Sequence, residues 1–154
     1  MTAAMFEEWR TRLRAIPYNR ELGLRFISLH ESGCVLCLPY RADLVGDPTT
    51  GVLHVGAIAA LVDTTLGYSL FRKIREERGL ATLDLRIDHL KQGVRDQDLF
   101  CSGDCYRVTD ELAFVRGSVY HQMPADLVAT AVSVFMFTAG PLAMSTSRAQ
   151  HDPA

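Results

Sequence analysis

The 154-residue sequence lacks the features that mark several classes of protein. It has no cluster of Lys and Arg, and its formal net charge is -2, which argues against nucleic-acid binding. Its longest charge-poor stretch is broken by Asp63 and by Gly and Thr residues, so no membrane span is predicted. The first ten residues carry acids and no long apolar run, unlike a secretory signal. We therefore expect a cytoplasmic protein that binds neither nucleic acid nor membrane.

Domain linkers and internal repeats are also absent from the sequence. With 48% hydrophobic and 22% charged residues, the chain has the composition of an ordinary globular protein and is long enough to bury a core. We expect one domain over residues 1–139, which includes a short N-terminal helix within residues 1–17. Residues 140–154 end in S-T-S-R-A-Q-H-D-P-A and read as a disordered tail.

Four cysteines raise the question of a metal site. Cys34 and Cys37 form a C-x-x-C pair, and Cys101 and Cys105 are four residues apart, which is one spacing of zinc ligands. Both pairs lie in stretches that read as strands, where residues three apart point to opposite faces. We therefore favour reduced, partly buried thiols over structural zinc, and expect no metal and no cofactor.

The rest of the chain divides into one amphipathic helix and several strands. Pro17 ends the predicted N-terminal helix. Gly46, Asp47 and Pro48 mark a loop over residues 41–50. Alternating or continuous apolar residues predict strands at 22–26, 35–40, 83–89, 99–108, 112–123 and 127–137. Short turns join the last strands, which indicates an antiparallel meander.

Residues 51–67, G-V-L-H-V-G-A-I-A-A-L-V-D-T-T-L-G, predict the front of a buried helix that reaches about residue 75 or 77, with Gly79 as its stop. A second stripe of small residues on this helix has Asp63 in its middle, and residues 52–71 contain no Lys or Arg. A carboxylate in such a place is costly unless it is hydrogen-bonded or serves chemistry. Asp63 is therefore either a structural hydrogen-bonding group or a catalytic carboxylate.

One long apolar helix with about six antiparallel strands is an α+β domain in which the sheet wraps the helix. This order, with the motif G-V-L-H-x-G-A-x-x-A-L-x-D-x-x-x-G, resembles the hotdog-fold thioesterases of the phenylacetyl-CoA (PaaI-like) type over residues 22–137. The later segments T-L-D-L-R-I-D-H-L and A-T-A-V-S-V-F also resemble strands of that family.

The resemblance implies an acyl-CoA thioesterase that hydrolyses a small, medium-chain or aryl acyl-CoA. Asp63 would be its general base or its nucleophile. The backbone amides of Val55 and Gly56 would hold the developing oxyanion. Thr82 would hydrogen-bond Asp63 or a water, and His54 would hold the loop or touch substrate. The family forms dimers that often pair into tetramers, with each site shared between two subunits.

For the substrate, the resemblance implies a narrow tunnel for the pantetheine arm and cations for the phosphates. The candidates for substrate binding are Asp47, Leu61, Thr64, Arg41, Lys91 and Arg107. For any one of these cations an ordinary solvated charge is the alternative interpretation.

Two positions depart from the family pattern. Val55 stands where the family has a glycine, and Pro48, next to Asp47, stands where it tends to have an asparagine. These departures keep open a non-catalytic acyl-CoA-binding hotdog protein. A hotdog hydratase or dehydratase is a further alternative, although the dehydratase glutamate is replaced here by Gly56.

Overall fold

The computed structural model describes residues 3–75 and 78–139. Its elements, in chain order, are α1 (Ala3–Ala15), α2 (Pro17–Glu21), β1 (Arg25–Leu29), β2 (Gly33–Leu38), the 3-10 turn η1 (Ala42–Leu44), β3 (Val45–Asp47), β4 (Val52–Leu53), α3 (Val55–Ile74), β5 (Gly79–His89), β6 (Leu99–Val108), β7 (Leu112–Tyr120) and β8 (Leu127–Thr138).

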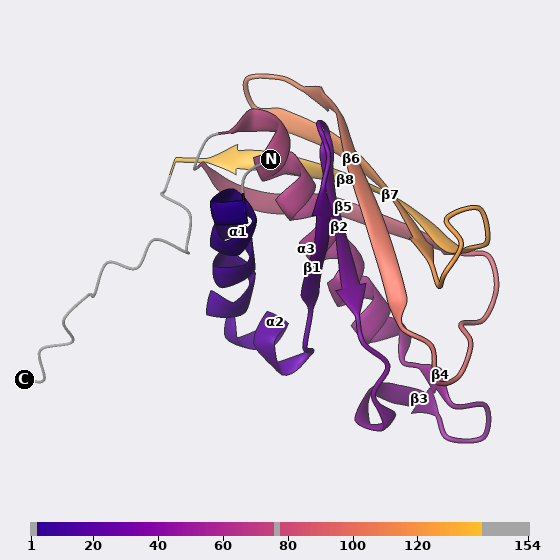
Figure 1. Cartoon of the computed structure of the whole chain (residues 1–154). Coiled ribbons are helices and arrows are strands. Elements are labelled where there is room, and N and C mark those ends of the chain that lie inside the picture. Colours follow the sequence, from indigo (N-terminus) through magenta and orange to yellow (C-terminus); the bar gives the residue numbers. More distant parts are fainter. Residues whose placement is uncertain (1–2, 76–77, 140–154) are drawn as a thin grey trace, which may run out of the picture.

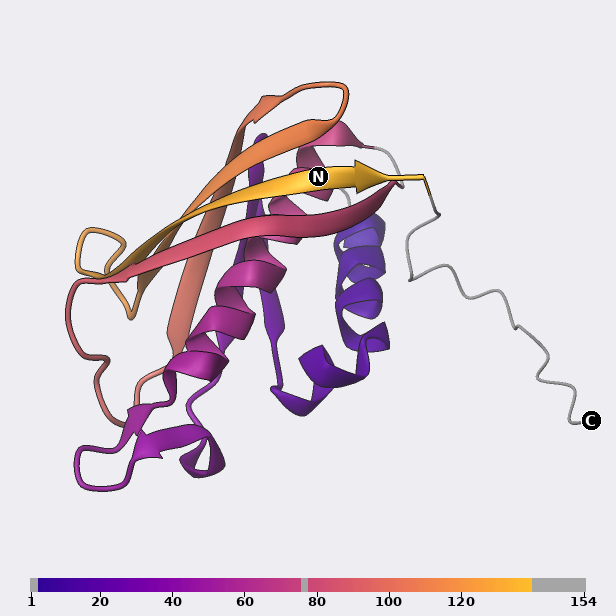
Figure 2. The same cartoon turned by 180° about the vertical axis from the view of Figure 1, so that it is seen from behind.

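Six strands form one antiparallel sheet in the order β1-β2-β6-β7-β8-β5. The sheet curves around α3, and α1 and α2 lie beside that helix at the β1 side of the molecule (Figures 1 and 2). This is the hotdog arrangement, and it confirms the predicted α+β fold. Strand β8, whose sequence is apolar on both faces, is an interior strand between β7 and β5, as predicted. Strand β5 pairs only with β8, so it forms one edge.

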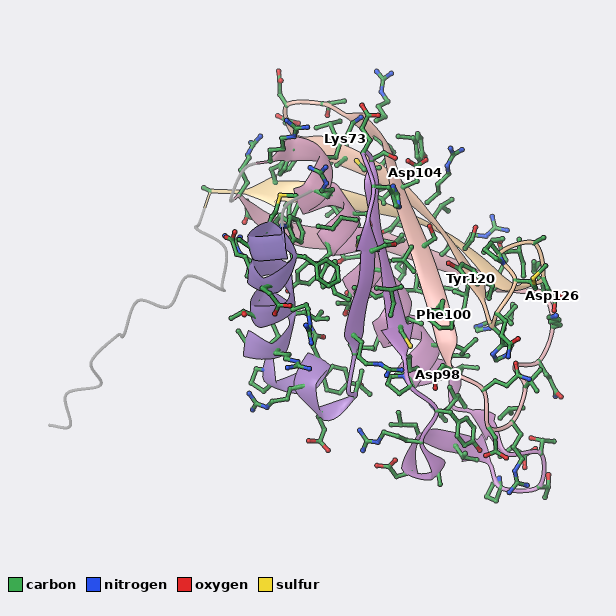
Figure 3. All side chains as sticks on the ribbon, in the orientation of Figure 1. Lys73, Asp98, Phe100, Asp104, Tyr120 and Asp126 are labelled. Carbon is green, nitrogen blue, oxygen red and sulfur yellow. The ribbon has the colours of Figure 1, made fainter. Side chains whose placement is uncertain are left out.

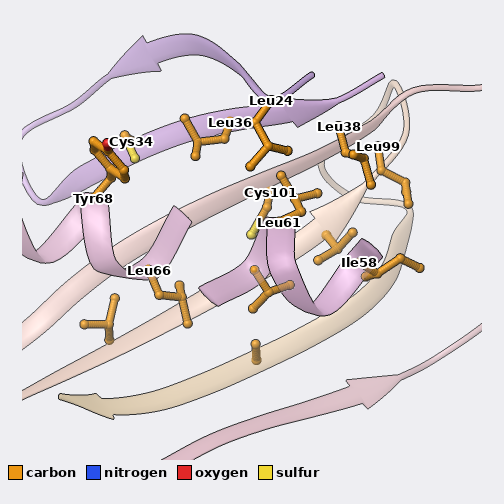
Figure 4. Close-up of a cluster of buried hydrophobic side chains, with 14 of the residues drawn as sticks. Leu24, Cys34, Leu36, Leu38, Ile58, Leu61, Leu66, Tyr68, Leu99 and Cys101 are labelled. Carbon is orange, nitrogen blue, oxygen red and sulfur yellow. The ribbon is translucent and has the colours of Figure 1, made fainter. Parts of the chain in front are cut away.

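The core lies between α3 and the sheet (Figure 4). Leu61 and Leu66 on the helix are fully buried, and so are Leu36 and Cys101 on the facing strands. Close approach of helix and sheet depends on glycine. A Cβ atom at Gly117 would come within 2.9 Å of Leu66 Cδ2, and one at Gly103 would overlap the Ser69 hydroxyl. We call Gly33, Gly103 and Gly117 the glycine seat, because their missing side chains make room for α3.

The structure changes the predicted end of the central helix. Helix α3 ends at Ile74, and Arg75 caps it in the left-handed conformation with φ of 55°. The Arg75 amide donates to Phe71 O and so satisfies one of the last helical carbonyls. Gly79 is therefore not the helix stop, because it is the first residue of β5. Arg75 therefore adopts the left-handed conformation that glycine usually takes after the last turn of a helix.

Other predicted boundaries were wrong as well. Helix α3 begins at Val55 and not at residue 51, β5 begins at Gly79 and not at residue 83, and β7 ends at Tyr120 and not at residue 123. The predicted strand at 22–26 begins only at Arg25, because α2 and a turn at Gly23 (φ 70°) occupy the preceding residues. Pro17 ends α1 as predicted but also opens α2, at the first helical position that suits proline. The predicted loop at 41–50 contains η1 and β3, and β3 pairs with β4.

All four cysteines are free thiols, as the strand interpretation predicted, but they are fully buried and not partly buried. Cys34 Sγ lies 3.5 Å from the Ser69 hydroxyl on α3, whereas Cys37 Sγ lies 3.7 Å from an oxygen of Asp98. The pair thus diverges. In residues 3–75 and 78–139 there is no group of three or more His, Cys, Asp or Glu side chains that could hold a metal ion. No helix in these ranges is long and apolar enough to cross a membrane.

The boundary of the domain at residue 139 remains a prediction. The tail predicted at 140–154 lies outside the described residues.

Candidate active site

A pocket of about 370 Å³ opens beside Asp63. Helix α3 supplies one wall, β5 and β8 supply another, and the connection into α2 covers a third. The lining residues are Ile16, Tyr18, Asn19, Asp63, Thr64, Gly67, Tyr68, Phe71, Leu80, Thr82 and Phe135. Most of them are apolar or aromatic, and the few polar groups gather around Asp63. Such a composition is typical of a small-molecule site.

Asp63 is held in place by the edge strand. The Thr82 hydroxyl donates to Asp63 Oδ1 at 3.0 Å, which confirms the contact expected between these two side chains. Next to this contact, β5 has an irregularity between Thr82 and Asp84 that leaves Leu83 without a partner on β8. The bond from Thr82 involves one oxygen of Asp63, and Oδ2 makes no hydrogen bond among the residues that the structure describes.

The start of α3 forms a second cluster. His54 is the N-cap of the helix, and its Nδ1 accepts a hydrogen bond of 2.9 Å from the Gly56 amide. This cap explains a structural role for His54. The Val55 amide makes no hydrogen bond to any described residue, and the residue as a whole is 57% exposed. Of the two expected oxyanion donors, the Val55 amide is therefore the one that is free.

The two clusters are separated along one helix. Gly56 and Asp63 are seven residues apart, which places them about 10 Å apart at 1.5 Å per residue. A thioester carbonyl cannot touch both Asp63 and the helix start of the same chain. If both clusters act on one substrate, they must come from different chains.

Asp47 and the loop that follows it stand next to the helix start. Asp47 Oδ1 accepts from the Thr49 amide at 2.9 Å and from the Thr49 hydroxyl at 2.6 Å. These bonds, with one from Thr50, lower the pKa of Asp47 below its usual range. Tyr40 fixes the end of the same loop by donating its hydroxyl to Gly51 O at 2.9 Å. Asp47 therefore orders its own loop.

The other candidate substrate contacts are scattered. Thr64 lines the pocket, whereas Leu61 is fully buried in the core and does not line it. Arg41 pairs with Asp43, and Lys91 pairs with Asp126.

Arg107 lies near the end of β6, at the end of the sheet opposite to β3, β4 and the start of α3. It follows Asp104, which Figure 3 shows near Lys73 at the end of α3, whereas Asp98 lies at the end close to β3 and β4.

Sequence reasoning missed two residues of this region. Asn19 reaches the pocket from α2, and no periodicity could reveal that, because α2 is only five residues long. Arg95 packs on the loop after Asp47: its Cδ lies 2.7 Å from where a Cβ of Gly51 would be. Gly51 has φ of 72°, so a glycine there serves both the turn and this close approach.

Comparison with known proteins places this geometry in a family. Residues 50–127 match the model of the thioesterase superfamily, and the chain belongs to that family. It is a thioester hydrolase by class. A Pseudomonas aeruginosa protein of known crystal structure is 37% identical, with a TM-score of 0.77, over 86% of this chain and 98% of that one. The resemblance to hotdog-fold thioesterases is confirmed.

The names of two other similar proteins state an activity or an operon. The medium/long-chain acyl-CoA thioesterase YigI of Escherichia coli K12 is 24% identical over 134 residues, which cover 79% of this chain and 85% of YigI. The E. coli PaaI protein of the phenylacetic acid degradation operon is 15% identical with a TM-score of 0.75, over 92% of this chain and 99% of PaaI. The likeness to PaaI shows a shared fold.

Proposed function

We propose that this protein hydrolyses acyl-CoA thioesters at a site formed by two copies of the chain, with Asp63 as the reacting carboxylate. The observation that supports it most is Asp63 itself, fixed by Thr82 on the wall of an apolar and aromatic pocket. The name of the similar protein YigI supports acyl-CoA as the thioester. The lining of Tyr68, Phe71, Leu80 and Phe135 suits a medium-chain or aryl acyl group.

In the proposed reaction Asp63 from one chain meets the thioester carbonyl, and the helix start of the other chain binds the oxygen of that carbonyl. The Val55 amide donates to the oxyanion as it develops, aided by the positive end of the helix dipole. Asp63 Oδ2 either takes a proton from the attacking water or attacks the carbonyl carbon itself. In both cases the C–S bond breaks, and the CoA thiolate leaves and takes up a proton.

The two roles of Asp63 differ in where the new oxygen comes from. Attack by Asp63 would form a mixed anhydride between Asp63 and the acyl group, and a single turnover with enzyme in excess in water labelled with oxygen-18 detects it when it is hydrolysed at the Asp63 carbon. A general base gives labelled acid in the first turnover, because water attacks the carbonyl carbon, and an anhydride hydrolysed at its acyl carbon gives the same label. A nucleophile gives acid whose new oxygen is the unlabelled carboxylate oxygen of Asp63 when water attacks the Asp63 carbon of the anhydride.

The first experiment measures thiol release from short, medium, long and aryl acyl-CoAs by wild type and Asp63→Asn. We expect the variant to keep its fold and its binding of acyl-CoA while kcat falls by roughly two to four orders of magnitude. Asp110→Asn, in the exposed turn between β6 and β7, is the matched control and should match wild type. Normal hydrolysis by Asp63→Asn would refute the role. Binding without turnover in wild type would instead indicate the acyl-CoA-binding protein that Val55 and Pro48 suggest.

The proposed donation from the Val55 amide to the oxyanion can be tested separately. Val55 is the first residue of α3, where proline is favoured, and His54 has ψ of 136°, which suits a residue before proline. Val55→Pro therefore removes the amide hydrogen at little cost to the fold. We expect kcat to fall by about 10² to 10³, whereas Val55→Ala, which keeps the amide, stays active. Equal activity of the two variants would exclude this donor.

The shared site is tested by mixing variants. In a hybrid dimer of Asp63→Asn and Val55→Pro subunits, one site carries both defects and the other carries neither. Random reassociation should therefore restore about a quarter of wild-type activity, since half of the dimers are hybrids with one intact site. No recovery, or a stable monomer in sedimentation, would contradict the shared-site model.

A further inference from the structure

Asn19 is the only asparagine in the chain, and it lies in the wall of the pocket beside Asp63. Its residue is only 5% exposed. The short helix α2, opened by Pro17, presents it, and its backbone carbonyl accepts from the Leu24 amide at 3.0 Å. This bond fixes the backbone of Asn19, whose side chain belongs to the lining of the pocket.

The carboxamide of Asn19 is only half satisfied. Its Oδ1 accepts from the Thr64 hydroxyl at 3.4 Å. Its Nδ2 takes part in no hydrogen bond among residues 3–75 and 78–139. Among the described residues only His30 Nε2 is a fully buried side-chain nitrogen or oxygen without a partner, so Asn19 Nδ2 is open to the space of the pocket. A ligand that fills the pocket displaces the water there, and Nδ2 then needs an acceptor on that ligand.

The place of Asn19 along the substrate follows from its partner. Thr64 is the residue after Asp63, and consecutive Cα atoms are about 3.8 Å apart. If Asp63 meets the thioester carbonyl, the carboxamide near Thr64 faces the first few carbons of the acyl group. The aromatic and aliphatic lining beyond, with Tyr68 and Phe71, suits an apolar remainder.

We infer that Asn19 makes this pocket selective for acyl-CoAs with an oxygen on the third carbon, such as 3-hydroxyacyl thioesters. This inference rests on the proposed function and names its substrate class. Nδ2 donates to the 3-oxygen, which an apolar pocket would otherwise disfavour, since an unpaired hydroxyl loses its hydrogen bonds to water there. The unsubstituted acyl group leaves the Asn19 donor unpaired, so a site of this kind discriminates against it.

Binding tests the inference separately from catalysis. Dissociation constants of octanoyl-CoA and of each enantiomer of 3-hydroxyoctanoyl-CoA are measured on full-length Asp63→Asn, which leaves the thioesters intact. We expect one 3-hydroxy enantiomer to bind about tenfold tighter than octanoyl-CoA, the worth of one such hydrogen bond. Equal or weaker binding of both enantiomers would overturn the inference. If wild type hydrolyses none of the three thioesters, the proposed function is refuted. The ratio of the dissociation constants still tests whether the pocket prefers a 3-hydroxyacyl group.

Asn19→Leu and Asn19→Ala identify the residue responsible. Introduced alongside Asp63→Asn, each should bring the ratio of the two dissociation constants to about one, because the donor is gone. Gln122→Leu, which removes a carboxamide in the exposed turn before β8, should keep the wild-type ratio. Each Asn19 variant is also assayed with Asp63 left intact. If the change lowers kcat by the same factor for octanoyl-CoA and for 3-hydroxyoctanoyl-CoA, Asn19 positions water and does not select the substrate. An unchanged ratio in both Asn19 variants would also overturn the inference.

Discussion

Replacing Gly67 with alanine is expected to separate the stability of α3 from the size of the pocket. Gly67 lies inside the helix and lines the pocket. A Cβ atom there would meet nothing nearer than Phe135 Cε1, at 3.9 Å, which is an ordinary contact. The new methyl group therefore fits without strain and occupies space that an acyl group would use.

Two effects of opposite sign follow. A glycine inside a helix is less stable than alanine by about 1 kcal/mol, so Gly67→Ala should stabilise the protein by about that amount. For a domain of this size the gain corresponds to a rise in Tm of about 2–4 °C. An acyl group that fills the pocket meets the added methyl, and overpacking of this kind costs about 1–3 kcal/mol. The kcat/KM of the largest good substrate should therefore fall by about tenfold, and that of the shortest should not change.

The assay combines thermal unfolding at one protein concentration with kcat/KM over saturated acyl-CoAs of increasing length. Gly33→Ala is the opposite control. A Cβ at Gly33 would overlap the backbone oxygen of Gly103, which cannot move aside, so this variant should lose stability. The contrast tests whether the space beside each glycine is as the structure shows.

A fall in Tm for Gly67→Ala would refute the reasoning, because it would mean that another backbone already fills the space beside Gly67. Unchanged turnover of all chain lengths would refute the assignment of this pocket to the acyl group.

Two more predictions follow from single contacts. Thr82→Val removes the donor to Asp63 Oδ1 with little change of shape, and we expect kcat to fall by about tenfold in the same thiol-release assay; an unchanged kcat would show that Thr82 is not needed to position Asp63. Burial raises the pKa of the Cys34 and Cys101 thiols to about 12, so both stay protonated at pH 8, and a thiol reagent should modify them only after denaturant is added. Rapid modification of the native protein would contradict their burial.

Much of the fold could be predicted because its signals are long. The apolar spacing of α3 and the strands β6 to β8 extend over nine or more residues each. Short elements carry too little pattern: α2, β3 and β4 were missed or read as loop. The end of α3 was predicted wrongly because Arg75 adopts a left-handed conformation that is usual for glycine. No local sequence pattern predicts this conformation for an arginine.

The part of the candidate site that lies on α3 could be predicted from the sequence. Asp63, Thr64 and the helix start belong to the motif, and the contact of Thr82 with Asp63 was expected. Asn19 and Arg95 come from segments that only the three-dimensional fold brings near the motif, so spacing gave no sign of them. Arg107 was chosen for its charge and its place near a loop, and neither property tells at which end of the sheet a residue will lie.

The glycine seat has a consequence for how such an enzyme can vary. Gly103 and Gly117 determine how closely α3 packs on the sheet, and Asp63 is a residue of that helix. A side chain added at either position would lift the helix and alter the reach from Asp63 to Thr82. The glycine seat therefore sets the position of Asp63, the carboxylate that we propose reacts. Substitutions at Gly103 or Gly117 would then change activity from positions that lie between the helix and the sheet, outside the lining of the pocket.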